Sequence, residues 1–168
     1  MNYKHALSTP IFEIISKSAE QLGFDSYAIG GFVRDFILDR DAKKDIDIVA
    51  IGSGIELAKR VSKNLPNNPK VQIFKNYGTA MIKYEGVDLE FVGARKESYT
   101  EDSRNPIVED GTLEEDQNRR DFTINAMAIS LNTANYGDLL DPFGGISDIT
   151  SKCIKTPLEP AITYSDDP

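Results

Sequence analysis

Two acidic residues lie one residue apart in a hydrophobic stretch of this 168-residue chain: Asp45 and Asp47, in D-I-D-I-V-A-I. Because a strand alternates its side chains, both carboxylates are expected on one face. Such neighbours repel and desolvate each other, and divalent cations relieve this best, so the pair predicts a Mg²⁺ site. The spacing alone is weak evidence, since 27 acidic residues give about four such pairs by chance. The alternative is an edge strand with both acids in water.

A third acid is available on a later strand, V-D-L-E-F. If that strand neighbours the first one, Glu90 completes a three-carboxylate metal site. Asp88 lies on the same face of its strand and is the competing candidate.

The glycine pair Gly30-Gly31 separates an apolar strand expected at 27–29 from a helix expected at 32–38. Missing side chains at such a turn expose backbone N–H groups to an anion, and Arg34 lies one helical turn further on. These residues suit a triphosphate. The alternative is a tight turn that only joins strand to helix.

A second charged group precedes an apolar stretch at 126–131: Arg119, Arg120 and Asp121, followed by Asn125. Guanidinium groups suit phosphate oxygens, whereas Asp and Asn suit ribose hydroxyls. The set therefore has the chemistry of a nucleotide pocket. The alternative is a surface salt-bridge cluster.

The elements that must position these residues form one folded unit. Apolar spacing predicts a helix over 10–22, ended by Gly23, and another over 55–65, capped by Ser53. Strands are expected at 45–51, 71–74, 79–84, 87–92 and 126–131, with a tight turn at Glu85-Gly86. Thr112 and Glu115 predict a capping box for a short acidic helix. We expect 94–111 to be an irregular, mobile flap, because it is long and polar.

Composition limits the function further. The net charge of −8 argues against gripping a nucleic-acid backbone through bulk electrostatics, so RNA must be held locally or elsewhere. No apolar run reaches the length of a membrane span and no secretory signal is visible, so a cytoplasmic protein without a membrane partner is expected. Cys153, in an expected strand-like run at 153–155, is interpreted as packing, and the single His5 makes zinc chemistry unlikely.

Four segments in this order resemble one family, the bacterial-type tRNA nucleotidyltransferases and poly(A) polymerases. They are G-G-F-V-R-D at 30–35, D-I-D-I at 45–48, L-E-F-V-G-A-R-K-E-S-Y at 89–99 and R-R-D-F-T-I-N-A-M at 119–127. The later D-P-F-G-G-I-S-D at 141–148 and the final S-D-D-P are also similar. The resemblance implies a polymerase β-like nucleotidyltransferase head of mixed α/β (α+β) class, with a largely antiparallel sheet flanked by helices.

The resemblance also implies roles for individual residues. Asp45, Asp47 and Glu90 would be catalytic and would bind two Mg²⁺ ions. The remaining residues would bind the nucleotide: Gly30, Gly31, Arg34, Arg119, Arg120, Asp121 and Asn125.

The implied reaction is untemplated addition of CMP and AMP, from CTP and ATP, to a tRNA 3′ end. A poly(A) polymerase would share all these motifs, and a non-catalytic nucleotide-binding module is a further alternative. We expect residues 1–155 to form the catalytic head and 156–168 to begin a linker to a neck. That neck and later domains, absent here, would select the base and hold most of the RNA, so the isolated fragment should be weakly active or inactive.

Overall fold

The computed structural model describes residues 1–40, 45–98 and 107–166. The helices are α1 (Pro10–Leu22), α2 (Gly31–Ile37), α3 (Gly54–Asn64), α4 (Leu113–Asn118), α5 (Gly145–Ser151) and α6 (Pro160–Asp166). The strands are β1 (Ser26–Ile29), β2 (Asp45–Ala50), β3 (Val71–Phe74), β4 (Thr79–Tyr84), β5 (Val87–Gly93), β6 (Arg95–Ser98), β7 (Ile107–Asp110), β8 (Ala128–Ser130) and β9 (Leu139–Leu140). Short 3-10 turns are η1 (Lys4–Leu7), η2 (Lys75–Tyr77), η3 (Thr123–Asn125) and η4 (Thr133–Asn135).

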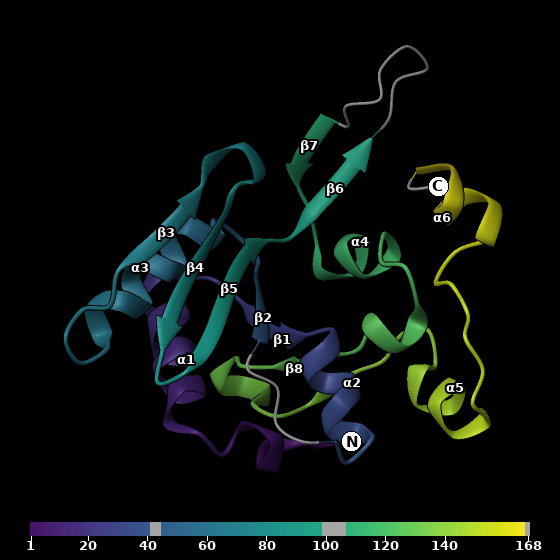
Figure 1. Cartoon of the computed structure of the whole chain (residues 1–168), viewed down its shortest axis with the longest axis horizontal. Coiled ribbons are helices and arrows are strands. Elements are labelled where there is room, and N and C mark those ends of the chain that lie inside the picture. Colours follow the sequence, from purple (N-terminus) through teal and green to yellow (C-terminus); the bar gives the residue numbers. More distant parts are fainter. Residues whose placement is uncertain (41–44, 99–106, 167–168) are drawn as a thin grey trace.

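Seven strands form one sheet in the order β3-β4-β5-β2-β1-β8-β9 (Figure 1). Every neighbouring pair is antiparallel except β2 and β5, which are parallel. The predicted mixed, largely antiparallel sheet flanked by helices is therefore confirmed. Parallel neighbours need a long crossover, which the chain supplies as α3, β3 and β4.

The main core lies on one face of this sheet, under α1, α2 and α3. In α1 the fully buried side chains Phe12, Ile15 and Ala19 follow helical spacing, and α3 buries Leu57 and Val61 in the same way. The opposite face carries a smaller apolar cluster, to which α4 contributes Leu113. The middle of that second face is left for polar side chains.

The predicted local signals for helix ends are present. Ser53 accepts a hydrogen bond from the Glu56 N–H at 3.2 Å at the start of α3. Thr112 and Glu115 form the capping box of α4, and Gly23 ends α1 with φ of 69°. These signals place the two scaffold helices and α4 where the sequence predicts them.

Several expectations were wrong in detail. The stretch 94–111 is not irregular throughout, because β6 and β7 pair within it; the sequence interpretation gave polar composition more weight than the β-branched Ile107-Val108. Residues 99–106 of the expected flap lie outside the described residues. Cys153 does not lie in a strand: it is half-buried and follows α5, which ends at Ser151. None of the helices in the described ranges combines the length and hydrophobicity needed to cross a membrane.

Candidate active site

The two aspartates of D-I-D-I lie on an interior strand. Strand β2 lies between β5 and β1, so the edge-strand alternative is wrong. Asp45 is exposed and Asp47 is half-buried, while Ile46 and Ile48 between and after them are buried in the main core. Both carboxylates therefore share the sheet face opposite the core, as the alternation predicts.

The parallel pairing of β2 with β5 brings the later acids beside them. Asp47 pairs with Glu90 and Asp45 pairs with Asp88 in the strand register. Asp88 also accepts a hydrogen bond from Lys83 at 3.1 Å, which partly neutralises it. Glu90 is thus the neighbour of Asp47, and Asp88 is the neighbour of Asp45.

The surroundings of Glu90 shift the pKa of its carboxyl group. Partial desolvation raises the pKa of its carboxyl, the Asp47 carboxylate raises this pKa further, and the Arg95 guanidinium lowers it. A pKa raised by partial desolvation and by a like charge is typical of acids that share a binding site. Even so, no three acidic, histidine or cysteine side chains in the described ranges form a ready-made metal cluster.

Gly30 brings the backbone against this acidic face. Its φ of 78° and ψ of −135° lie in a region that L residues with side chains rarely adopt. A Cβ atom at Gly30 would lie 3.4 Å from Asp47 Oδ2 and 3.3 Å from Arg120 Nη1. The turn between β1 and α2 therefore lies between the acidic strand and Arg120, and its positive φ favours glycine.

The other predicted nucleotide residues meet on the same side of β2. Arg34 of α2 donates to Asn125 Oδ1 at 2.7 Å, and Asn125 Nδ2 donates to Asp121 Oδ1 at 3.1 Å. Arg34 Nε also donates to Asp35 at 2.8 Å. Segments 91 residues apart in the chain thus form one polar network, which places Arg34, Asp121 and Asn125 together and near Gly30.

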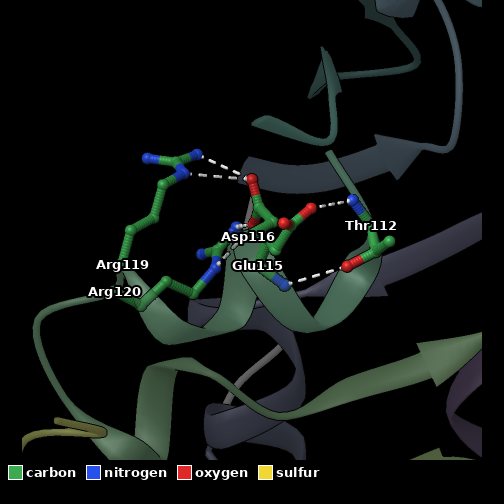
Figure 2. Close-up of polar contacts among 5 residues, drawn as sticks. All are labelled: Thr112, Glu115, Asp116, Arg119 and Arg120. Atoms are coloured by element: carbon green, nitrogen blue, oxygen red, sulfur yellow. Dashed lines mark hydrogen bonds and ion pairs between the residues drawn. The ribbon is translucent and has the colours of Figure 1, made fainter. Parts of the chain in front are cut away.

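Asp116 is a residue of this region that the sequence reasoning missed (Figure 2). Its carboxylate is completely buried, and Oδ1 accepts from Arg119 Nη2 at 2.7 Å while Oδ2 accepts from Arg120 Nη2 at 3.1 Å. One carboxylate therefore fixes both guanidinium groups. The signal in the sequence was the spacing of Leu113, Asp116 and Gln117, which puts the acid on the packed face of α4.

Two further buried polar groups hold η3, the turn that carries Asn125. Gln117 Nε2 donates to the Ala126 carbonyl at 2.6 Å. Asp148 accepts from Thr123 Oγ1 at 2.7 Å and pairs with Lys155 at 2.8 Å. These two bonds lower the pKa of Asp148, with Lys155 the larger cause. The turn is thus tied to both α4 and α5.

A cavity of about 1130 Å³ lies away from these residues, between α1, α2 and the core face of the sheet. Its lining includes Phe12, Phe36, Ile46 and Leu89, and none of the predicted site residues. Its size is comparable to small-molecule pockets, but the candidate acids Asp45, Asp47 and Glu90 do not line it. The candidate site is therefore the open polar face, where Asp47, Glu90, Gly30 and Arg120 come together.

A family model described as the poly A polymerase head domain matches residues 26–155. An A-adding tRNA nucleotidyltransferase of Aquifex aeolicus (strain VF5) is 43% identical over 143 residues, which cover 85% of this chain and 17% of that protein. A CCA-adding enzyme of Anoxybacillus flavithermus (strain DSM 21510 / WK1) is 32% identical over 155 residues, covering 91% and 36%. The chain thus spans well under half the length of these curated relatives.

Solved structures give the same picture. A tRNA nucleotidyltransferase in complex with a primer tRNA and an incoming ATP analogue superposes with a TM-score of 0.77 and 38% identity, over 92% of this chain and 41% of that one. A CCA-adding enzyme without ligand superposes with a TM-score of 0.87 and 32% identity, over 100% and 40%. The sheet and helices described above are therefore shared with these structures.

Proposed function

This chain belongs to the poly A polymerase head-domain family, and on that premise we propose that it is the nucleotidyl-transfer head of an enzyme that extends tRNA. The proposed reaction is the addition of CMP and AMP, from CTP and ATP, to the tRNA 3′ end without a template. The observation that carries the proposal is the pairing of Asp47 with Glu90 beside Gly30 and Arg120. The relatives, an A-adding tRNA nucleotidyltransferase and a CCA-adding enzyme, support these substrates.

Asp45, Asp47 and Glu90 would hold two Mg²⁺ ions. Their chemistry fits, because hard carboxylate oxygens are the ligands that Mg²⁺ prefers, and the acids share one face of adjacent strands. Like-charge repulsion between Asp47 and Glu90 already raises the pKa of Glu90, so a cation between them would be favourable. When bound, such ions activate an attacking hydroxyl and neutralise charge on the phosphates.

The other residues of the network would bind and orient the nucleotide. The backbone of Gly30 and Gly31 would lie against the triphosphate, with Arg34 and Arg120 neutralising its oxygens. Asn125 and Asp121 offer hydrogen-bonding groups to the ribose, and Arg119 shares the Asp116 carboxylate with Arg120. In phosphoryl transfer the protein mainly positions reactants and stabilises charge, which is what this set of side chains can do.

We also propose that residues 1–155 form the catalytic head and that 156–168 begin the linker to further domains. The family match to residue 155 and the small share of the relatives that this chain spans support that division. Base selection and most RNA binding would then belong to other parts of the enzyme.

Replacement of the acids tests the catalytic proposal. In the natural enzyme that carries this head, Asp45→Ala or Asp47→Ala should lower the rate of nucleotide incorporation by about 10³-fold or more, because each ion lowers the activation barrier by several kcal/mol. Glu90→Gln should do the same, whereas Asp88→Asn on the same sheet face is the matched control. Incorporation within tenfold of wild type in an aspartate variant with an unchanged circular-dichroism spectrum would contradict the metal assignment.

A poly(A) polymerase is the second candidate, because the matching family model carries that description. The two reactions differ in product length. With a tRNA that lacks its CCA end, an enzyme of the first kind stops at the completed end, whereas a poly(A) polymerase continues into a long tail of adenylates. Sizing the products on a denaturing gel separates them. If the natural enzyme binds nucleotides but incorporates none, the head is a non-catalytic nucleotide-binding module.

A further inference from the structure

Positive charge is concentrated in one segment of this acidic molecule, residues 57–84, here called the basic limb. Residues 57–84, which include most of α3 and all of β3, η2 and β4, contain six basic residues and not one acidic residue. They are Lys59, Arg60, Lys63, Lys70, Lys75 and Lys83. With a net charge of −8 for the whole chain, this limb is the part best suited to attract an RNA backbone.

Two aromatic side chains are exposed at the turn between β3 and β4. Phe74 is 43% exposed at the end of β3, and Tyr77 is 69% exposed in η2. Phe74 pairs with Thr79, two residues before the Met81 that pairs with Glu90, so Phe74 faces the same side of the sheet as the acids. Exposed aromatic rings beside basic groups are the usual platform for unpaired bases.

Arg95 connects this turn to the acidic site. It is the first residue of β6, and its Nη2 atom would be 3.7 Å from a Cβ atom at Gly78, which ends η2. Its charge acts on Glu90 on the other side. Among the described residues Nη2 has no hydrogen-bond partner although it is buried. The Arg95 residue as a whole is only half-buried, so its guanidinium can turn toward a phosphate oxygen, and an N–H without an acceptor gains strongly from such a contact.

The position of the limb relative to the nucleotide residues is also informative. Gly30, Arg34 and Arg120 lie on the β1 side of β2, whereas β4 and β3 follow β5 on the other side (Figure 1). In phosphoryl transfer the attacking and leaving oxygens are roughly in line, on opposite sides of the phosphorus. With pyrophosphate leaving on the β1 side, the RNA hydroxyl must approach from the side of β4.

We propose that Phe74, Lys75, Tyr77 and Arg95, here called the turn surface, bind the unpaired 3′ end of the RNA that is extended. The two rings stack on its last bases, and Lys75 and Arg95 contact its phosphates. This inference rests on the proposed nucleotidyl transfer for its orientation argument. It assigns the head itself a part in RNA binding.

The test measures binding of a 5′-fluorescein-labelled single-stranded RNA with a free 3′ hydroxyl to this chain, by fluorescence anisotropy. Tyr77→Ala should raise the Kd about fivefold or more, because stacking on an aromatic ring contributes substantially per base. Tyr164→Ala, which removes a tyrosine that is 52% exposed on α6, is the matched control and should leave the Kd unchanged. Binding of ATP should be the same in all three proteins.

Salt dependence separates a local site from diffuse attraction. Lys75→Ala should reduce the slope of log K against log salt by about 0.7, the value for one phosphate contact to a single strand. Lys63→Ala, an exposed lysine of α3 in the same basic limb, should reduce it less. Equal effects of the two lysine variants together with no effect of Tyr77→Ala would overturn the turn surface.

The remaining outcomes are also decisive. Absence of RNA binding by wild type at about 50 mM salt, where phosphate contacts are strong, overturns the inference. In the natural enzyme, a wild-type KM for RNA in both Tyr77→Ala and Arg95→Lys would also overturn the inference. That result would leave the proposed reaction intact. If the natural enzyme incorporates no nucleotide, the proposed function fails and not only the assignment of the turn surface.

Discussion

Replacing the buried carboxylate of Asp116 by an amide should weaken both folding and nucleotide binding. In wild type the two oxygens accept four charge-assisted hydrogen bonds, two from Arg119 and two from Arg120. Asp116→Asn keeps the size of the side chain but leaves one oxygen, so about half of these bonds lose their acceptor and the rest lose the charge. The amide N–H₂ group also faces a guanidinium.

The expected loss of stability in Asp116→Asn depends on how exposed the two arginine side chains are. Removing one partner of a fully buried ion pair costs about 3–5 kcal/mol. Here the Arg119 and Arg120 side chains are 32% and 17% exposed, so both can regain water, and we expect a loss of about 2 kcal/mol in the free energy of unfolding. For a domain of this size that lowers Tm by roughly 4–8 °C. Because Arg120 loses its fixed position, the Kd for ATP should rise about tenfold.

Urea unfolding followed by circular dichroism gives the first quantity, and titration calorimetry with ATP gives the second. Glu114→Gln is the matched control, since it removes a negative charge from an exposed position of the same helix and should change the unfolding free energy by less than about 0.5 kcal/mol. If Asp116→Asn binds ATP within twofold of wild type, Asp116 does not position Arg120 for the nucleotide, and the reasoning is refuted.

Two other predictions concern the acidic face. Gly30→Ala should lower stability by about 1–3 kcal/mol through its positive φ, and it should also weaken ATP binding, because its Cβ atom would lie 3.3 Å from Arg120 Nη1 and displace that guanidinium. Gly86→Ala, with φ of 79° and nothing within 4 Å, should show only the stability loss. Equal ATP affinity in both variants would contradict a role of the Gly30 turn in binding the nucleotide. Glu90→Gln should raise stability at neutral pH, as measured by urea unfolding. The raised pKa means that the folded state keeps this proton when the unfolded state has lost it, so wild type loses stability as pH rises through that window. Below the ordinary pKa of about 4.3 the two proteins should be equally stable, and a difference that persists there would have another cause.

Local sequence signals predicted much of the fold because short-range physics decides it. The Ser53 and Thr112 caps, the positive φ at Gly23 and the alternation in D-I-D-I each depend on a few neighbouring residues, and the structure has all of them. The grouping of Arg34 with Asn125 is different, because the chain between them is long. For that grouping the family resemblance, rather than residue chemistry, carried the prediction.

Features that depend on tertiary packing were missed or left open. Asp116 was interpreted only as part of an acidic helix, because its complete burial exists only once Leu113 packs against the second face of the sheet. The choice between Asp88 and Glu90 depended on strand register, which parity alone cannot fix, since both acids share a face. The roles of Asp116 and Glu90 stay predictions until the Asp116→Asn and Glu90→Gln variants are measured.

The parallel register of β2 and β5 has a consequence for which length changes this fold can accept. Glu90 lies between Leu89 and Phe91, which are both fully buried in the main core. A single-residue insertion or deletion between Val87 and Glu90 would exchange the two sets of side chains, turning a carboxylate into the apolar layer and two hydrophobic groups toward solvent. The crossover through 65–70 has no such constraint, because loop length there leaves the pairing unchanged. Natural length variation in this fold should therefore accumulate in the crossover and avoid the first half of β5.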